Sequence, residues 1–381
     1  MTAAAPGAAP VRAGEFPLVT PEIRPLLTAA FAWDLPHCAL APPPTPLDDE
    51  RWARLFDAVH RQRGDGVLAW AIHDGWWPAT DRQRTSVYGA HRRNMALAVL
   101  LERELVEIAS ACAASHTSFR VLKGVTIAHL DERDPSLRSF GDVDLLVAAD
   151  DLETVATVLE ARGGRRRYSE PHRGFDRRFS KGMSFAFDRN CEIDVHRSLA
   201  SGAFGLSIVL DDLFRAAEPF TVGGVPLLAL DRPNRFLHAA YHALLGSPQV
   251  RLGSLRDLVL TAPRDDHETR EVLGRARRWK GEAVVAQAVA LAAQWFAWTP
   301  PLLLGAWAGA FTPSARDRRW LSAYVGTERS YAGQMLVGLE AVPGVRGRVA
   351  YAIGNARSPS HAPTLDRWQR GVRALRHSVR P

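Results

Sequence analysis

The sequence predicts an α/β fold of the α+β kind, in which a small mixed sheet is flanked by an N-terminal helical lobe and a C-terminal helical domain. Three observations support this. Apolar residues recur at helical spacing, with no strand pattern, up to residue 118. Short β-branched segments bounded by turn residues then occupy residues 117–200, and helical spacing returns after residue 205. A length of 381 residues suits two or three domains.

The N-terminal part is expected to be helical after a loosely ordered start. Residues 1–45 are rich in proline and alanine and indicate a partly disordered arm. Residues 46–116 form the predicted helical lobe, where Asp48-Asp49-Glu50 suits the positive end of a helix dipole. A long helix is expected from about Asp81 to Ala114. The apolar residues that set the first helical period are Trp52, Leu55, Phe56 and Val59.

Residues 117–200 form the predicted α/β core. A short strand from Phe119 ends at Gly124, and Val143–Val147 forms a second strand. Residues 183–187 and 191–196 predict a hairpin around Asp188-Arg-Asn190. The alternation of strands with helices favours a small mixed sheet.

The C-terminal part is expected to be helical over residues 201–340. Pro233 suits the first turn of one helix, because its missing N–H has no partner there. Further helices are expected near 254–262, 268–298 and 315–340. Residues 341–381 are basic and broken by glycine and proline, and they are assigned to a C-terminal tail.

The composition excludes several classes of protein. Cys38, Cys112 and Cys191 are widely spaced and odd in number, which excludes a disulfide framework and a CxxC site. The N-terminus lacks the apolar segment of a signal peptide, and the uncharged stretch 283–315 is broken by Pro300-Pro301. We therefore expect a cytoplasmic protein without a membrane span. The net charge of +7 comes mainly from arginine, which favours an anionic substrate.

The most informative residues are two aspartates at the start of an apolar strand. Asp142 and Asp144 project to the same face, where a divalent cation is the usual agent that offsets their repulsion. Such a pair alone is more often a solvated strand end. The preceding strand and glycine turn, the apolar strand and the later Asp194 favour a metal site. If the strand that contains Asp194 lies beside the strand that contains Asp144, three carboxylates converge and can hold two Mg²⁺ ions.

These segments resemble a known family. Leu122-Lys-Gly124, Arg138-x-x-Gly-Asp-x-Asp-Leu-Leu-Val147 and Glu192-Ile-Asp-Val-His196 are similar to motifs of an uncharacterised nucleotidyltransferase family in the polymerase-β-like superfamily. The resemblance spans about residues 90–330. Members are often encoded beside peptide-natural-product gene sets, lasso peptides included, or polysaccharide gene sets.

The resemblance implies a set of roles for residues of this chain. Asp142 and Asp144 would bind metal, and Asp194 would lie near the acceptor hydroxyl as base or second-metal ligand. Gly124 stands where the superfamily usually has a Gly-Ser turn; here lysine precedes it and no serine follows. The residues implied to bind the nucleotide are Lys123, Gly124, Thr126, Arg138 and Gly141.

Three histidines and one aspartate form a candidate acceptor pocket. His238 and His242 have a spacing that can bind zinc, but no adjacent glutamate or third ligand accompanies them, so we assign them to the core or the pocket. Asp257 is expected in a buried network with one of these histidines or with Arg256. His196 either orients Asp194 or fills space beside the sheet.

The expected function is Mg²⁺-dependent transfer of a nucleoside monophosphate from an NTP, such as ATP, to a hydroxyl or phosphate of an unidentified acceptor, with release of pyrophosphate. The acceptor is a peptide, a small molecule or a sugar. Two alternatives stay open. One is a catalytically degenerate nucleotide-binding regulatory protein. The other is a nucleic-acid-binding protein that uses a basic cluster of Arg162, Arg165, Arg166, Arg167, Arg173, Arg177, Arg178 and Lys181.

Overall fold

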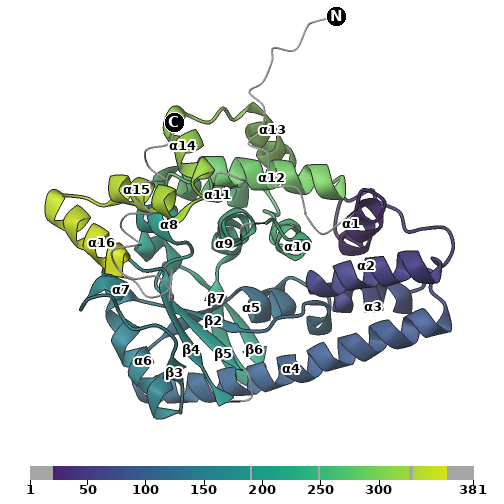
Figure 1. The fold of residues 1–381 in the computed structure, drawn as a ribbon, viewed down its shortest axis with the longest axis horizontal. Coiled ribbons are helices and arrows are strands. Elements are labelled where there is room, and N and C mark those ends of the chain that lie inside the picture. The colour runs from purple at the N-terminus through teal and green to yellow at the C-terminus, as the bar shows by residue number, and fades with distance from the viewer. Residues whose placement is uncertain (1–19, 189–190, 248, 326–328, 358–381) are drawn as a thin grey trace, which may run out of the picture.

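A computed structural model describes residues 20–188, 191–247, 249–325 and 329–357. A seven-stranded mixed sheet lies between the long helix α4 and a layer of C-terminal helices (Figure 1). This confirms the predicted α+β fold. The strands are β1 Phe119–Leu122, β2 Val143–Val147, β3 Arg165–Arg166, β4 Gly182–Ala186, β5 Glu192–His196, β6 Ala217–Val222 and β7 Val225–Leu230.

Within the described residues four helices precede the sheet, and side chains cap two of them. They are α1 Arg24–Ala32, α2 Asp49–Arg61, α3 Asp65–His73 and α4 Asp81–Ala114. The Asp48 side chain accepts the backbone N–H of Arg51 and caps α2, and Thr80 and Gln83 form a capping box at the start of α4. Helix α1 differs from the arm expected over residues 1–45, because Leu27 and Phe31 are buried in the core. Residues 1–19 lie outside the described residues.

The sheet has the strand order β3-β4-β5-β2-β1-β7-β6. Strand β2 pairs antiparallel with β1 and parallel with β5, and β5 pairs antiparallel with β4. One row of the register therefore runs Leu122, Asp144, Asp194, Ser184 across four strands. Residues paired directly across strands point to the same face, so this row defines one face of the sheet.

The hairpin of β6 and β7 was not predicted. Helices were expected directly after residue 205, and this expectation is wrong because residues 217–230 add two strands to the sheet. The turn is Gly223-Gly224, and both glycines have positive φ. Glycine pairs of this kind favour two-residue hairpin turns, so the signal was present in the sequence.

The remaining helices follow or connect the strands. Helix α9 begins at Arg232 with Pro233 in its first turn, as predicted, and Asp231 caps it. The helix expected over 268–298 is two helices, separated at Lys280, which has a left-handed backbone. The helix expected over 315–340 is also divided into two helices. Residues 345–357 of the expected tail form the helix α16, and residues 358–381 lie outside the described residues. The helices are α5 Lys123–Leu130, α6 Leu152–Ala161, α7 Phe175–Arg178, α8 Gly202–Ser207, α9 Arg232–Leu245, α10 Leu252–Leu260, α11 Asp266–Arg278, α12 Glu282–Phe296, α13 Leu302–Ala310, α14 Ala315–Ser322, α15 Tyr331–Ala341 and α16 Val345–Arg357.

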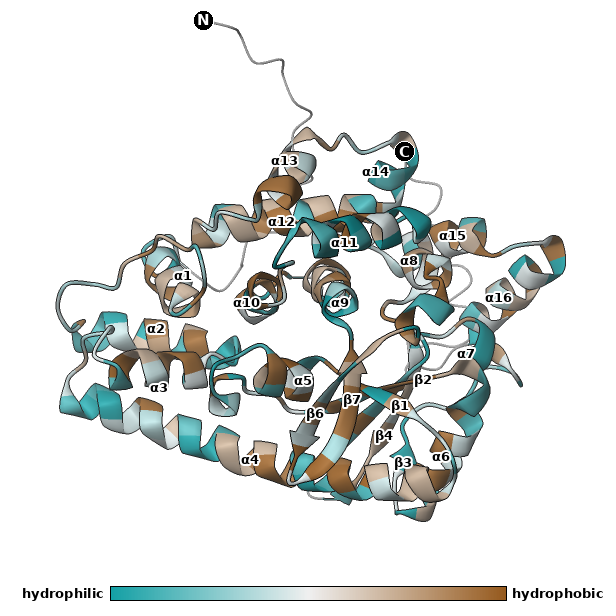
Figure 2. Ribbon diagram, turned by 180° about the vertical axis from the view of Figure 1, so that it is seen from behind, coloured by the Kyte–Doolittle hydropathy of each residue, from teal (hydrophilic) through white to brown (hydrophobic). Residues whose placement is uncertain are grey.

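The two faces of the sheet pack into different apolar cores. Val121 and Leu145 enter a core with residues of α4 and α6. Leu122 and Leu146, on the opposite face, enter a larger core with residues of α9, α10 and α12. In Figure 2 the strand β7 and the helix α12 are mainly brown, whereas α11 is mainly teal. The row that contains Asp144 and Asp194 therefore faces the C-terminal helices.

The described helices include none long and apolar enough to cross a membrane. The three cysteines are free thiols, and Cys112 is buried.

A buried arginine joins three separate parts of the chain. Arg256 of α10 donates two hydrogen bonds of 2.8 Å to the carboxylate of Glu132, just after α5, and both side chains are 1% exposed. The same guanidinium donates to the carbonyls of Phe31 and Trp33 at the end of α1. Because all of these groups are removed from water, each depends on the others for its hydrogen bonds.

We expect Arg256→Met to lower the free energy of unfolding by about 3–5 kcal/mol, because Glu132 keeps a buried charge without a partner. The double variant Arg256→Met/Glu132→Leu should recover part of this loss. The exposed pair of Arg54 and Glu50 supplies the control, since Arg54→Met should change the stability by less than about 1 kcal/mol. Urea denaturation measures all three variants, and equal losses for Arg256→Met and Arg54→Met would contradict the expectation.

Candidate active site

The centre of the site is a pair of aspartates on neighbouring parallel strands. Asp144 of β2 lies opposite Asp194 of β5 in the register. With His196, two residues further along β5, they offer ligand atoms that all lie within 4.8 Å of one another. The strands hold this geometry because the alternate residues Val143 and Ile193 are fully buried on the other face. The sequence-based expectation that carboxylates from two strands meet is confirmed for Asp144 and Asp194.

Asp144 is buried and doubly bonded. Lys123 Nζ and His196 Nε2 both lie 2.5 Å from its Oδ1 atom, and the residue is 2% exposed. Burial alone would raise the pKa of the Asp144 carboxyl, but the charge of Lys123 and the hydrogen bond from His196 outweigh it and hold this pKa well below its usual range. Asp144 is therefore an ionised carboxylate.

His196 forms a hydrogen bond with Asp144, a partner that the sequence did not indicate. Burial, followed by the positive charge of Lys181, lowers the pKa of His196 to about 4. The imidazole is therefore neutral at pH 7 and donates its Nε2–H to the carboxylate. The Nδ1 atom is buried and has no hydrogen-bond partner in the described part of the chain.

Asp142 lies at the rim of the pair. It precedes β2, its side chain is 38% exposed, and Arg63 is 3.9 Å from its Oδ1 atom. Burial and the neighbouring charge of Asp144 raise the pKa of Asp142. The Asp142 carboxylate therefore interacts electrostatically with Asp144 but lies outside the group of ligand atoms formed by Asp144, Asp194 and His196.

The residues fit a divalent cation. The Oδ1 atom of Asp194 is buried and has no hydrogen-bond partner among the residues that the structure describes. An unpartnered carboxylate oxygen beside a second carboxylate is the donor set that Mg²⁺ takes from proteins, with its other positions filled by water and phosphate. Asp144 and Asp194 would supply protein ligands, and Asp142 is near enough to interact electrostatically.

Lys123 and Gly124 place the start of helix α5 beside Asp144. Lys123 has a left-handed backbone, with φ of 43°, at the point where β1 passes into α5. A Cβ atom on Gly124 would lie 2.6 Å from the Cβ of Phe140, so only glycine allows this close approach. The free N–H groups of the helix N-terminus and the Lys123 ammonium favour an anion here.

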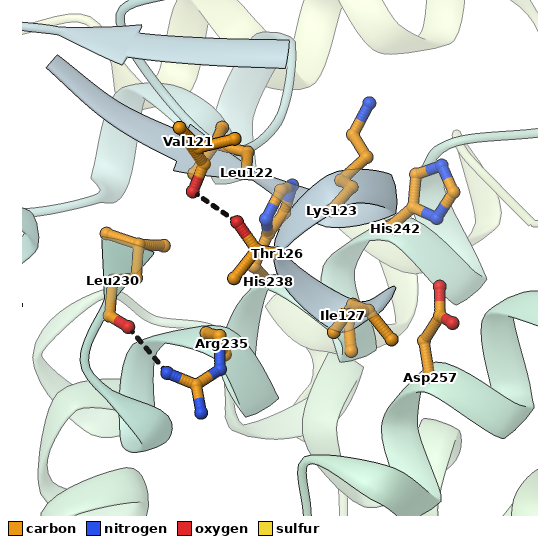
Figure 3. Close-up of a pocket in the computed structure, with 11 residues that line it drawn as sticks. Val121, Leu122, Lys123, Thr126, Ile127, Leu230, Arg235, His238, His242 and Asp257 are labelled. Carbon is orange, nitrogen blue, oxygen red and sulfur yellow. Dashed lines mark hydrogen bonds between the residues drawn. The ribbon is translucent and has the colours of Figure 1, made fainter. Parts of the chain in front are cut away.

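Two of the five residues expected to bind the nucleotide have other partners. The Thr126 hydroxyl is buried and donates to the carbonyl of Val121 (Figure 3). Arg138 forms a bidentate ion pair with Asp257, at 2.8 and 2.9 Å. Because these polar groups already have partners within the protein, Thr126 and Arg138 are not part of the candidate nucleotide site. Gly141 borders the Arg63 guanidinium, 3.2 Å from where its Cβ would be.

Three of the four expected acceptor-pocket residues line a small cavity, and His196 is not among them. His238, His242 and Asp257 line it together with Lys123, whose side chain extends away from Asp257 (Figure 3). Its volume of about 10 Å³ is room for about one water molecule and excludes an acceptor. Asp257 belongs to a buried network, as expected, but its partner is Arg138 and not a histidine or Arg256. Burial, and then the charge of Lys123, lowers the pKa of both histidines well below the usual value.

Two further cations lie on the elements that carry the site, and only Lys181, as a member of the basic cluster, was considered from the sequence. Lys181 precedes β4, and burial, followed by the charge of Lys123, lowers its pKa to about 8. Arg197 follows His196, is 6% exposed, and donates from Nε to the Ser180 carbonyl. The scarcity of lysine was an available signal, because two of the three lysines in the chain lie at this site.

Most of the basic cluster of residues 162–181 is neutralised by carboxylates. Its ion pairs are Arg162 with Glu104 and Glu107, Arg165 with Asp188, Arg166 with Asp176, Arg167 with Glu192, and Arg177 with Asp150. Paired arginines attract a polyanion less than free ones do, so this surface gives no specific support for nucleic-acid binding.

A mixed sheet with carboxylates on two adjacent strands, next to a lysine at a helix N-terminus, has the features of a protein that handles phosphate groups with a metal ion. A protein-family model described as an uncharacterised nucleotidyltransferase matches residues 48–297, about two-thirds of the chain. The chain therefore belongs to this nucleotidyltransferase family, as the sequence motifs indicated. Neither the curated proteins nor the solved structures include a match.

The two aspartates should differ in their effect on stability. Asp144→Asn should lower the free energy of unfolding by about 3 kcal/mol at pH 7, because it leaves the Lys123 ammonium without its buried counter-charge. The folded-state pKa of Asp144 is depressed, so its contribution is present above the unfolded pKa of about 3.9 and is lost as the pH falls. The difference between wild type and variant should therefore shrink below about pH 4.

Asp142→Asn is the matched control. The pKa of Asp142 is raised by burial and by Asp144, so removal of its charge should leave stability at pH 7 unchanged or slightly higher. Chemical denaturation at several pH values measures both variants. Equal destabilisation by the two substitutions would contradict the assignment of Asp144 as the buried, paired carboxylate.

Proposed function

We propose that the protein transfers a nucleoside monophosphate from an NTP, in the presence of Mg²⁺, to a hydroxyl or phosphate group of an acceptor and releases pyrophosphate. One observation carries the proposal: the buried, unpartnered oxygen of Asp194 lies beside the ionised Asp144, next to Lys123 and the start of α5. Membership of the nucleotidyltransferase family supports the same chemistry.

In this proposal Asp144 and Asp194 hold the metal, with Asp142 at the rim. Mg²⁺ bound there would neutralise charge on the triphosphate and make the attacking hydroxyl more acidic. His196 keeps Asp144 oriented through its Nε2–H, and because it is neutral it adds no charge that would repel a cation.

The cations bind and orient the phosphates. Lys123 and the N-terminal N–H groups of α5 lie on the β1 side of the carboxylates, and Lys181 lies on the β4 side. During transfer the acceptor oxygen bonds to the α-phosphorus, and the bond from that phosphorus to the bridging oxygen breaks. Asp194 accepts the hydroxyl proton, and Lys123 stabilises the charge that develops on the departing pyrophosphate.

The direct test of catalysis incubates the protein with each α-labelled NTP, Mg²⁺ and a host lysate. Wild type should label an acceptor and release pyrophosphate, and Asp144→Asn and Asp194→Asn should reduce both by at least about 100-fold, because each removes a carboxylate that would hold the metal ion and Asp194→Asn also removes the proposed base. Labelling that is equal in wild type and variants would eliminate these roles. Nucleotide binding without pyrophosphate release would instead support a regulatory protein.

Nucleotide and metal should stabilise the fold together. A non-hydrolysable ATP analogue at about 100 times its Kd, with Mg²⁺, should raise the free energy of unfolding by about 2.7 kcal/mol. Removal of Mg²⁺ with EDTA should abolish most of this gain, as should Asp194→Asn, which removes one proposed ligand without breaking an internal hydrogen bond of its Oδ1 atom. Thermal unfolding measures the effect. A gain that is unaffected by EDTA and by Asp194→Asn would contradict the proposed metal site.

A further inference from the structure

A second, larger pocket lies beside strand β4. Its volume is about 300 Å³, and it is bounded by β4, α7, the start of α8 and the helices α15 and α16. These helices meet at one edge of the sheet, away from α9 and α10 (Figure 1). The size is at the lower end of the range for ligand pockets, which suits a small molecule or a single side chain.

The pocket shares a sheet face with the proposed catalytic carboxylates. Ser184, which lines the pocket, is paired directly with Asp194 in the register of β4 and β5. Directly paired residues project to the same face, so the Ser184 end of the pocket adjoins Asp194. Lys181 also lines the pocket and interacts electrostatically with both Asp144 and Asp194.

Of the two substrates, the nucleotide and the acceptor, the position of the pocket suits the acceptor. Along the sheet, β1 with Lys123 lies on one side of β2 and β5, and β4 with the pocket lies on the other. An in-line displacement needs the attacking and leaving oxygens on opposite sides of the phosphorus. With the phosphates bound at Lys123 and the start of α5, the attacking hydroxyl arrives from the β4 side.

The lining indicates the chemical class of the occupant. Aromatic rings and methionines make up the walls, and serine hydroxyls and amides lie among them. The one carboxylate in the lining, Asp176, already binds Arg166 and the Ser180 hydroxyl. Apart from Lys181 at the end next to Asp194, such a surface accepts an uncharged aromatic body with a few hydrogen-bonding groups. The apolar lining consists of Tyr168, Pro171, Phe175, Phe179, Met183, Tyr331, Met335 and Tyr351.

We propose that this pocket binds the acceptor, and that the acceptor is an uncharged aromatic molecule, or an aromatic side chain, that carries the attacking hydroxyl. The proposal rests on the proposed function and names its acceptor class. The hydroxyl oxygen forms a bond to the α-phosphorus, its proton passes to Asp194, and the bond to the pyrophosphate oxygen breaks. The small cavity at His238 and His242 then has no part in acceptor binding.

The test measures binding of N-acetyl-L-tyrosinamide, an uncharged phenol, to the full chain by ligand-observed NMR. Met335→Trp should fill the pocket and weaken this binding at least about tenfold. Met95→Trp, a matched substitution on α4 outside the pocket, should leave it unchanged. Binding of the Mg²⁺ complex of the non-hydrolysable ATP analogue should be the same in both variants.

A second variant keeps the test valid if Met335→Trp does not fold. Tyr168 is 46% exposed and lines the pocket, so Tyr168→Ala removes a ring without opening the core. We expect it to weaken probe binding by about three- to tenfold.

Three results would overturn the proposal. The first is that wild type does not bind the probe at about 10 mM. The second is that wild type and both pocket variants bind the probe equally. The third is that the pocket variants lose nucleotide binding, which would assign the pocket to the nucleotide base. Failure of the proposed function is a separate result, because it appears as absent Mg²⁺-dependent nucleotide binding in wild type whatever the probe does.

Discussion

The parallel pairing of β2 with β5 is the constraint on which the site depends, because it sets Asp144 opposite Asp194 in a place partly shielded from water. Two carboxylates so close repel one another strongly at low dielectric. The surrounding residues offset this repulsion. Lys123 and His196 bond to Asp144, and Lys181 adds a positive charge on the other side. Asp144 is therefore stable as a carboxylate before any ligand arrives.

The fold holds these charges in place from both faces of the sheet. Helices α4 and α6 bury the alternate strand residues on one face, which fixes the register and so the side on which the aspartates project. On the other face, Arg256 ties α10 to α1 and to the segment after α5. Lys123 is the first residue of α5, so these hydrogen bonds connect the helix that carries the lysine to α10 and α1. Distant residues thus contribute to the geometry of the site by positioning its elements.

Local patterns predicted what depends on neighbouring residues in the chain. The strand of Val143–Val147 and the long helix of Asp81–Ala114 follow from side-chain spacing. The pairing of Arg138 with Asp257 joins residues that are 119 positions apart, and no local period encodes it. Lys181 stands in a run of arginines, so its sequence neighbours suggested solvent exposure, although the fold places it half-buried and close enough to interact with Asp144 and Asp194. Thr126 shows the converse, a plausible phosphate ligand that instead satisfies a backbone carbonyl.

The bond from Lys123 to Asp144 gives this carboxylate an internal counterion. A metal ion bound to Asp144 would take over part of this counterion role, which would leave more of the ammonium charge for an anion at the first turn of α5. Metal and polyphosphate would in this way favour each other's binding.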